Sequence, residues 1–396
     1  MLNIIVFLLL GILVGLITGL LPGLHPNTIA VLLLSISSLL LGFGQIPLLV
    51  FLVSLGITNS ITDFIPSIIL GAPEGANALS ALPGHKMLMK GKGFNAIMLT
   101  VKGGVYSILF SLILLPLIIL GLPLVYNIIK PSLAFVLILL SLSLITMEEN
   151  KALALLFFIL SGILGLVSMN LPIDSRYTLF PLLTGLFGFS LLLNQLRTQS
   201  KVPRQSFEYK EKNTKKNALF GTIGGFFSGI LPGITPSQIA AFLNKENKEF
   251  LTIVGAITTT NILISFLAIK LISHPRSGIA VVLQQLMKIG YNEILIIIPV
   301  SIVSVTFASL STISLSKIIL KNIHKINYQA LSYVVLIILN IGIFLATGIF
   351  GLFIAWTAAL IGLSSLLYKI RRYTLMGSLI IPSILFYLGI NTAFLF

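Results

Sequence analysis

The sequence contains no cysteine among its 396 residues, so it has no disulfide framework, no thiol nucleophile and no Cys-ligated metal. Charged residues are also scarce, at 9% of the chain, while hydrophobic residues make up 57%. Such a chain cannot bury its apolar side chains in a water-soluble fold, and its recurring apolar runs of about 20 residues match the thickness of a bilayer core. The composition therefore predicts an all-α, polytopic membrane protein.

Enzyme signatures are missing as well. The sequence has no HExxH, GxSxG or GxxxxGK[ST] motif, and its 4 histidines are scattered, so we expect no enzyme, no cofactor and no metal site. The net charge of +15 is typical of basic cytoplasmic loops and does not by itself indicate nucleic-acid binding. The first apolar run is too long for a signal peptide and has no basic residue before it, so we expect it to be part of the fold.

Two stretches of the chain are copies of each other. Residues 11–30 read GILVGLITGLLPGLHPNTIA, and residues 221–240 read GTIGGFFSGILPGITPSQIA. Between 15–30 and 225–240, 8 of 16 positions are identical, and both copies carry a Pro-Gly-x-x-Pro break inside an apolar helix. This indicates a duplicated unit, with a first repeat at 1–196, a basic cytoplasmic linker at 197–217 and a second repeat at 218–396.

Each repeat is predicted to contain a broken-helix hairpin followed by about five transmembrane helices. The second arm of the second hairpin has only about eight apolar residues, 237–244, which is too short to cross a bilayer. We therefore expect re-entrant hairpins, and small residues at every fourth position of each first arm predict close helix packing. The predicted spans are 46–70, 95–122, 131–147, 151–169 and 177–196, then 250–272, 294–320, 329–347, 350–368 and 375–395.

The odd number of spans in each repeat makes the two repeats oppositely oriented. Placing the linker in the cytoplasm puts 20 of the 25 Lys and Arg residues on the cytoplasmic side, which agrees with the positive-inside rule. The sequence thus predicts two inverted-topology repeats in the cell membrane, with both termini outside. The same count would result if the hairpins crossed fully, so their depth stays open.

Inverted repeats with broken helices are typical of secondary transporters. A break leaves backbone N–H groups at the start of a half-helix, and these favour an anion. Polar residues in the next span of each repeat either complete such a pocket, coordinate Na⁺ or join helices by hydrogen bonds. We expect the substrate near Pro22, Gly23, His25, Asn27, Thr28, Pro232, Gly233, Thr235, Ser237, Gln238, Thr58, Asn59, Ser60, Thr260 and Asn261, and a coupling ion near Asp63, Thr258 and Thr259.

The two breaks and residues 55–96, with the core PGHKMLMKGKG at 83–93, resemble the large permease subunit of tripartite tricarboxylate transporters, the TctA family. This resemblance implies ion-driven uptake of carboxylates, with a small membrane subunit and an extracytoplasmic binding protein as partners. The sequence departs from the family pattern at Glu74-Gly75 and at Lys86, which leaves the substrate and these partners open.

The expected function is a secondary active transporter for a small organic anion, a di- or tricarboxylate, coupled to Na⁺ or H⁺. Two alternatives stay open, a polyprenyl-phosphate translocase and a non-transporting membrane scaffold. Membrane lipid is the other expected contact, and the sequence leaves the oligomeric state open, a homo-oligomer included.

Overall fold

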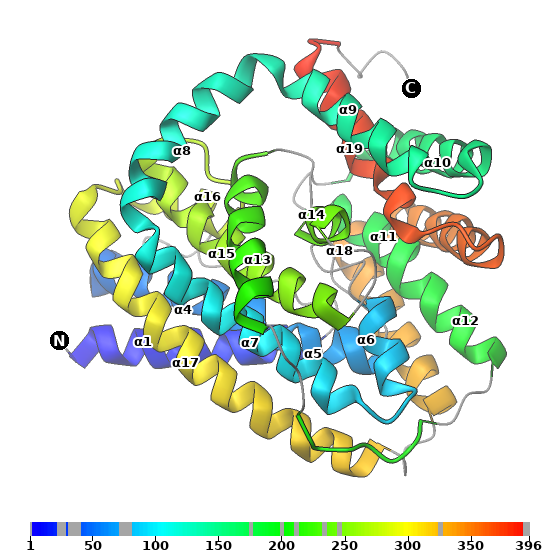
Figure 1. The fold of residues 1–396 in the computed structure, drawn as a ribbon, viewed down its shortest axis with the longest axis horizontal. Coiled ribbons are helices and arrows are strands. Elements are labelled where there is room, and N and C mark those ends of the chain that lie inside the picture. Colours follow the sequence, from blue (N-terminus) through cyan, green and yellow to red (C-terminus); the bar gives the residue numbers. More distant parts are fainter. Residues whose placement is uncertain are drawn as a thin grey trace.

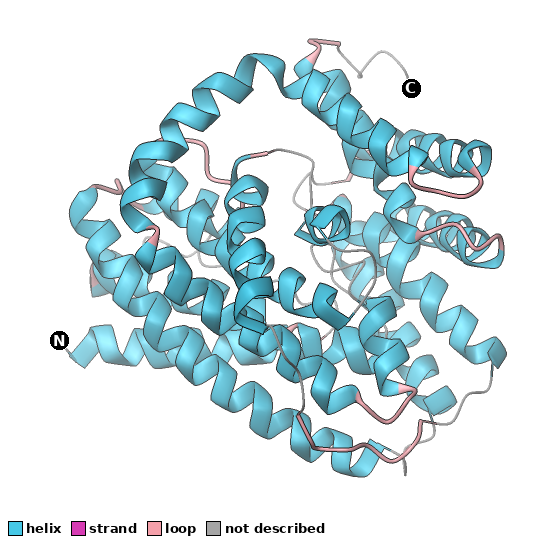
Figure 2. Ribbon diagram, in the orientation of Figure 1, coloured by secondary structure: helices cyan, strands magenta, loops and turns pink. Residues whose placement is uncertain are grey.

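The structure is a computed structural model that describes residues 2–21, 29–30, 41–70, 81–173, 177–198, 202–209, 214–231, 236–243, 248–323 and 328–390. Within these residues the chain forms helices joined by loops and contains no strand (Figures 1 and 2). The prediction of an all-α protein is confirmed.

The helices before the basic linker include long apolar helices and short helical segments. They are α1 (Leu2–Leu20), η1 (Leu41–Phe43), α4 (Gln45–Thr62), α5 (Phe64–Leu70), α6 (Ala81–Leu88), α7 (Gly93–Ile113), α8 (Leu115–Ile129), η3 (Lys130–Ser132), α9 (Leu133–Thr146), α10 (Lys151–Asn170), α11 (Leu179–Leu183), η4 (Thr184–Phe189) and α12 (Ser190–Thr198). The helices that follow are α13 (Thr214–Ile230), α14 (Pro236–Leu243), α15 (Lys248–Leu271), α16 (Gly278–Leu286), α17 (Tyr291–Asn322), α18 (Tyr328–Leu367), η6 (Arg372–Met376) and α19 (Gly377–Tyr387).

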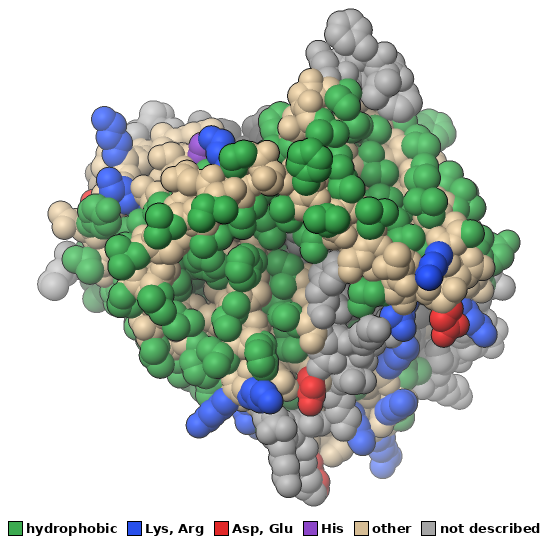
Figure 3. All heavy atoms as spheres, turned by 45° about the horizontal axis from the view of Figure 1, so that its top comes forward, with side chains coloured by type: hydrophobic (Ala, Val, Ile, Leu, Met, Phe, Trp, Pro, Cys, Tyr) green, Lys and Arg blue, Asp and Glu red, His purple; other side chains and the backbone are tan. Residues whose placement is uncertain are grey.

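Eight helical segments of the described chain are long and apolar enough to cross a membrane. Their outer faces are apolar too: on α8, Leu117, Leu120, Leu124 and Ile128 are each between 64% and 74% exposed. Figure 3 shows hydrophobic side chains across the middle of one face, with Lys and Arg gathered toward its edges. Side chains of this kind avoid water, so the surface fits a lipid environment and the chain is a multi-pass membrane protein.

Several predicted spans differ from the observed helices, and for three of them the cause is local. The predicted span 95–122 is divided at Leu114, because Pro116 cannot donate a backbone hydrogen bond to the preceding turn, and the next helix, α8, begins at Leu115. The predicted spans 329–347 and 350–368 both lie within α18, which is interrupted at Gly348. Its φ of +64° lies in the left-handed region that glycine adopts without strain.

The helices that carry the two copies of the repeated sequence, α1 and α13, pack in the same way, on α4 and on α15 respectively. A Cβ placed on Gly15 would lie 2.7 Å from the Thr58 Cβ, and one on Gly225 would lie 2.5 Å from the Thr260 Cβ. One turn further along, Gly19 contacts Thr62 and Gly229 contacts Ile264. Residue numbers therefore increase in the same direction along the two helices of each pair, so α1 runs parallel to α4 and α13 runs parallel to α15.

The spans α4 and α15 then cross at the centre of the molecule, where Figure 1 shows α15 with α13 above the α1 and α4 pair. Ser60 Oγ lies 3.3 Å from Thr259 Oγ1. Four residues earlier on α4, Gly56 contacts Ile262 and Phe266, which come later on α15. Rising numbers on one helix meet falling numbers on the other, so α4 and α15 are antiparallel.

The described part of the linker, residues 202–209, packs against the α6–α7 turn. Gln205 Oε1 accepts from the Gly93 N–H at 2.8 Å, and the Ser206 N–H donates to Gly91 O at 2.8 Å. Nearby, Lys102 Nζ lies 3.7 Å from the centre of the Tyr209 ring. A basic segment expected to be a simple connection is therefore bonded to the first repeat.

The close contacts at these glycines predict how alanine substitutions change the stability of the protein. Gly225→Ala forces Thr260 and the Ile257 carbonyl away from the new methyl group, so we expect the purified protein to lose about 1–3 kcal/mol of stability. The thermal midpoint in detergent measures this. Gly121→Ala on α8 is the matched control, because no atom lies within 4 Å of its added Cβ. Equal midpoints for the two variants would contradict the close contact.

Candidate functional site

The breaks themselves lie largely outside the described residues, among them Pro22, Gly23, His25, Asn27 and Thr28 of the first and Pro232, Gly233 and Thr235 of the second. The pocket between them therefore stays a prediction. The elements that border it are described: α1 ends at Leu20, α13 ends at Ile230, and α14 begins at Pro236. Proline suits the first turn of a helix, because the N–H groups there have no partner within the helix. The next residue, Ser237, is fully buried. Gln238 also belongs to α14.

The predicted polar residues of α4 are buried beside the first hairpin arm. Asn59 Nδ2 donates to Thr18 Oγ1 at 3.2 Å, and Thr18 Oγ1 donates to Gly15 O. Further along, Thr62 Oγ1 lies 3.2 Å from Thr312 Oγ1 on α17. Polar groups from the first repeat thus reach both the hairpin and a span of the second repeat.

The matching residues of α15 meet this polar group. Thr259 Oγ1 accepts a hydrogen bond from Ser60 Oγ. Thr258 Oγ1 donates instead to Val254 O of its own helix, at 2.8 Å. Asn261 is half-buried on the same helix. The structure therefore brings Ser60 and Thr259 together from the two halves of the chain, as a shared site requires.

Two hydroxyls at equivalent positions of the repeats have no hydrogen-bond partner among the described residues. They belong to Thr58 and Thr260, and both side chains are fully buried. Helical threonines commonly donate to the carbonyl four residues back, as Thr62 does to Thr58 O. Buried hydroxyls without a partner are costly, and the pair marks a place where a ligand, an ion or water would be stabilised.

Asp63, the predicted coupling-ion residue, lies inside the packed structure, with 6% of its surface exposed. A Cβ on Gly19 would lie 3.1 Å from its backbone nitrogen, so the carboxylate-bearing residue is within one turn of the first break. Its counterpart in the second repeat is Ser265, which accepts from the N–H groups of Arg276 and Ser277 at 2.8 and 2.6 Å. Ser265 thus holds the loop at Arg276 and Ser277 by hydrogen bonds. Ion coupling at Asp63 stays a prediction.

Arg276 is a site residue that the sequence analysis did not single out. Its Nη2 and Nε donate to Ile230 O at 2.7 and 3.1 Å, at the end of α13 and directly before the second break. Burial lowers the pKa of this guanidinium, and the phenols of Tyr387 and Tyr126 act in the opposite direction. No local pattern in the sequence indicates this contact, because Arg276 and Ile230 are 46 positions apart in the chain.

Comparison with known proteins gives the family. The sequence pattern of the tripartite tricarboxylate transporter TctA family matches residues 5–377. The chain belongs to the TctA family. Over 405 aligned residues it is also 35% identical to an uncharacterized protein of Methanocaldococcus jannaschii, with 98% of this chain and 100% of the relative covered. No solved structure matches the chain.

TctA membership confirms the resemblance inferred from the PGxxP breaks and the 83–93 element. It gives the chain a permease-like role in a family of transporters, whose members act within tripartite systems. The substrate, the coupling ion and the partner subunits are not specified by this match.

In this TctA-family protein, the unpartnered threonines give a test that separates packing from binding. Thr58→Val and Thr260→Val keep the side-chain shape and remove a hydroxyl without a described partner, so each should stabilise the ligand-free protein by up to about 1 kcal/mol. The control is Thr222→Val, because Thr222 Oγ1 already donates to Ala218 O at 2.8 Å and its loss should give no gain. Thermal midpoints of the purified variants give the comparison. Equal destabilisation of all three would show that Thr58 and Thr260 are also bonded.

Proposed function

We propose that this TctA-family protein is a secondary active transporter that moves a small organic anion, a di- or tricarboxylate, across the cell membrane, driven by a Na⁺ or H⁺ gradient. The two hairpins form one substrate pocket, and each repeat contributes one broken helix to it. Both termini lie outside the cell.

The observation that carries the proposal is the antiparallel crossing of α4 and α15. Each of these helices packs in parallel on its own hairpin arm through equivalent glycines, Gly15 and Gly225. Two equal helix pairs that face each other antiparallel are what an inverted repeat produces. In many secondary transporters, the substrate binds at the interface between two inverted repeats, near the middle of the bilayer.

The loop contacts support the proposed orientation. The linker residue Gln205 bonds to the α6–α7 turn, and Arg371 lies 3.9 Å from Glu148, so loops assigned to the cytoplasmic side contact one another. On the opposite side, the His274 ring lies 5.6 Å from the Tyr126 ring. The count of Lys and Arg residues by the positive-inside rule assigns these loops to the same two sides of the membrane.

The chemistry of the site supports an anionic substrate. The start of α14 at the second break presents backbone N–H groups, and the positive end of the helix dipole favours a carboxylate. The Arg276 guanidinium lies at the same break and adds positive charge. The buried oxygens of Ser60, Thr259 and Asp63 are the groups from which a Na⁺ site or a proton acceptor would be built.

Uptake by reconstituted protein tests the proposal. Proteoliposomes should accumulate radiolabelled citrate or succinate when a Na⁺ or H⁺ gradient is imposed, and collapse of the gradient should abolish accumulation. Pro232→Ala combined with Gly233→Ala should lower uptake at least tenfold, because a continuous helix removes the free N–H groups of the break. Pro299→Ala is the control, since this proline lies inside α17, and its uptake should be unchanged.

Absence of uptake for every carboxylate under both gradients, with correctly folded protein, would count against the proposal. Binding of polyprenyl phosphate by that same protein would then favour a lipid-phosphate translocase. Reconstitution with and without a small membrane subunit and an extracytoplasmic binding protein of the family shows whether the chain works alone.

A further inference from the structure

Arg276 is held in place at the end of α13, directly before the second Pro-Gly-x-x-Pro motif. Its backbone N–H and that of Ser277 donate to Ser265 Oγ of α15 at 2.8 and 2.6 Å. Its Nε and Nη2 both donate to Ile230 O, in the last residue of α13, at 3.1 and 2.7 Å. Bonds to two different helices therefore fix the guanidinium beside the motif.

These bonds occupy one edge of the guanidinium and leave its end available. Nε and Nη2 lie on the same edge, and their N–H groups converge on one oxygen. The end of the group is formed by Nη1 and the second N–H of Nη2, and Nη1 donates to no described residue. The side chain is only half-buried, and Nη1 is not among the fully buried atoms that lack a partner, so a small ligand can reach this end.

Arg276 also has no carboxylate partner among the described residues. The groups there that act on its charge are phenols, those of Tyr126 on α8 and Tyr387 on α19. A partly buried cation with hydrogen-bond donors that the protein does not use is a place where an anion is stabilised.

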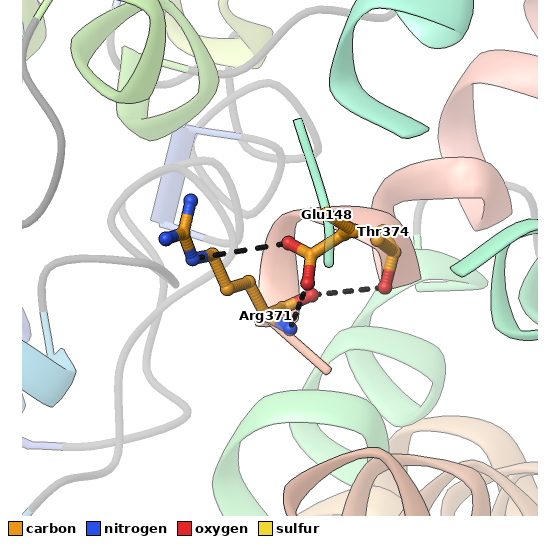
Figure 4. A network of polar contacts seen from close by, with 3 residues as sticks. All are labelled: Glu148, Arg371 and Thr374. Carbon is orange, nitrogen blue, oxygen red and sulfur yellow. Dashed lines mark hydrogen bonds and ion pairs between the residues drawn. The ribbon is translucent and has the colours of Figure 1, made fainter. Parts of the chain in front are cut away.

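The two arginines that precede α19 are different. Figure 4 shows Arg371 facing Glu148, with Arg371 Nε 3.9 Å from Glu148 Oε1 and the Arg371 N–H donating to Oε2 at 3.5 Å. Arg372 is fully buried, and its Nη2 donates to two carbonyl groups of the π-helical turn η4, Leu186 O and Phe187 O, at 2.7 Å each. One has a carboxylate partner and the other is enclosed by protein, so neither is an accessible cation without a counter-charge.

The first Pro-Gly-x-x-Pro motif has an acid nearby instead. Asp63, with 6% of its surface exposed, lies within one turn of Gly19 near the end of α1. The equivalent position on α15 is Ser265, which is neutral and holds the Arg276 loop. Within the described chain, it is therefore the second motif that offers an anion a cationic partner.

A hydroxyl at the end of α13 supports the same conclusion. Ser228 is 4% exposed, and its Oγ has no hydrogen-bond partner among the described residues. The equivalent residue of α1, Thr18, accepts from Asn59 Nδ2 at 3.2 Å. The polar groups near the end of α1 are thus bonded to each other, whereas those at the end of α13 keep unused hydrogen-bonding capacity.

The Nη1–Nη2 end of a guanidinium presents two parallel N–H groups, which match the two oxygens of a carboxylate. We propose that Arg276 binds a carboxylate group of the transported substrate through this end, beside the second motif. That the carboxylate belongs to a transported molecule rests on the proposed function, whereas carboxylate binding at Arg276 does not.

The test compares Arg276→Lys and Arg276→Gln in the full-length protein. Lysine keeps the charge and a donor for Ile230 O but loses the paired N–H groups, and glutamine also loses the charge. The matched control is Lys288→Gln, which removes an exposed cation on the same predicted side of the membrane. Citrate, succinate and inorganic phosphate are titrated into each purified protein in detergent by calorimetry, and the thermal midpoint without ligand shows whether the fold is kept.

We expect citrate or succinate to bind Arg276→Lys about three- to tenfold more weakly than the unsubstituted protein, and Arg276→Gln more than about tenfold more weakly, because a charge-assisted bidentate contact is lost in two steps. Lys288→Gln should bind within about twofold of the original, since an exposed charge is screened by salt. Absence of binding by the unsubstituted protein, or unchanged affinity of Arg276→Gln, would overturn the site. Phosphate or a short-chain phosphatidylglycerol that binds through Arg276 and is not displaced by citrate or succinate would overturn the carboxylate assignment.

A measurement on the unsubstituted protein decides if these variants do not fold. Phenylglyoxal modifies accessible guanidinium groups, and mass spectrometry locates the modified arginines. Citrate should slow the modification of Arg276 and leave that of Arg204, an exposed arginine of the linker, unchanged. Equal modification of Arg276 with and without citrate, or none in either case, would contradict the proposal.

Transport in proteoliposomes separates this site from the transport function. A raised KM for citrate or succinate in Arg276→Lys would support both. Uptake with an unchanged KM would retain the transporter and reject the site as a substrate site. Carboxylate binding that depends on Arg276 in a protein without uptake would retain the site and reject the transporter.

Discussion

Close approach of helix backbones at glycine is the constraint on which the rest of this structure depends. In a bilayer, lipid tails are as apolar as the side chains, so helices associate through packing and polar contacts rather than through exclusion of water. Gly15 and Gly225 allow each hairpin arm to contact its neighbouring span, and Gly103 and Gly255 allow α7 to approach α15 from the other repeat. Larger residues at these positions would separate the helices and open the polar centre.

Interrupted helices are a second feature of this structure. In two places an arginine side chain donates hydrogen bonds to the carbonyl oxygens of an interrupted helix. A helix end or a π turn leaves carbonyl oxygens without a partner, and a guanidinium supplies several donors in one plane. Arg276 binds the last carbonyl of α13, and Arg372 binds two carbonyls of η4. Each cation lies at an irregular segment, where backbone groups need partners that the apolar surroundings do not provide.

The sequence predicted the helical class and most of the long apolar helices, because hydrophobic run length is a local signal. The short arm at 237–244 became the eight-residue α14, and the glycine periodicity correctly indicated close packing. It did not predict the role of Arg276 or Arg372, because each contacts residues far away in the chain, Ile230 and Leu186 respectively. Nor did it predict the linker contacts, since its basic composition is typical of a solvated segment.

By itself, the sequence determined that this is an all-helical membrane protein of the TctA family with two copies of a Pro-Gly-x-x-Pro motif, because composition and sequence motifs are properties of the chain alone. Only the tertiary structure decided that α4 and α15 cross antiparallel, that Ser60 meets Thr259, and that the buried Arg372 binds the carbonyl groups of Leu186 and Phe187. These are distances between residues separated by more than a hundred positions. They are fixed by how the helices pack, and no local pattern contains them.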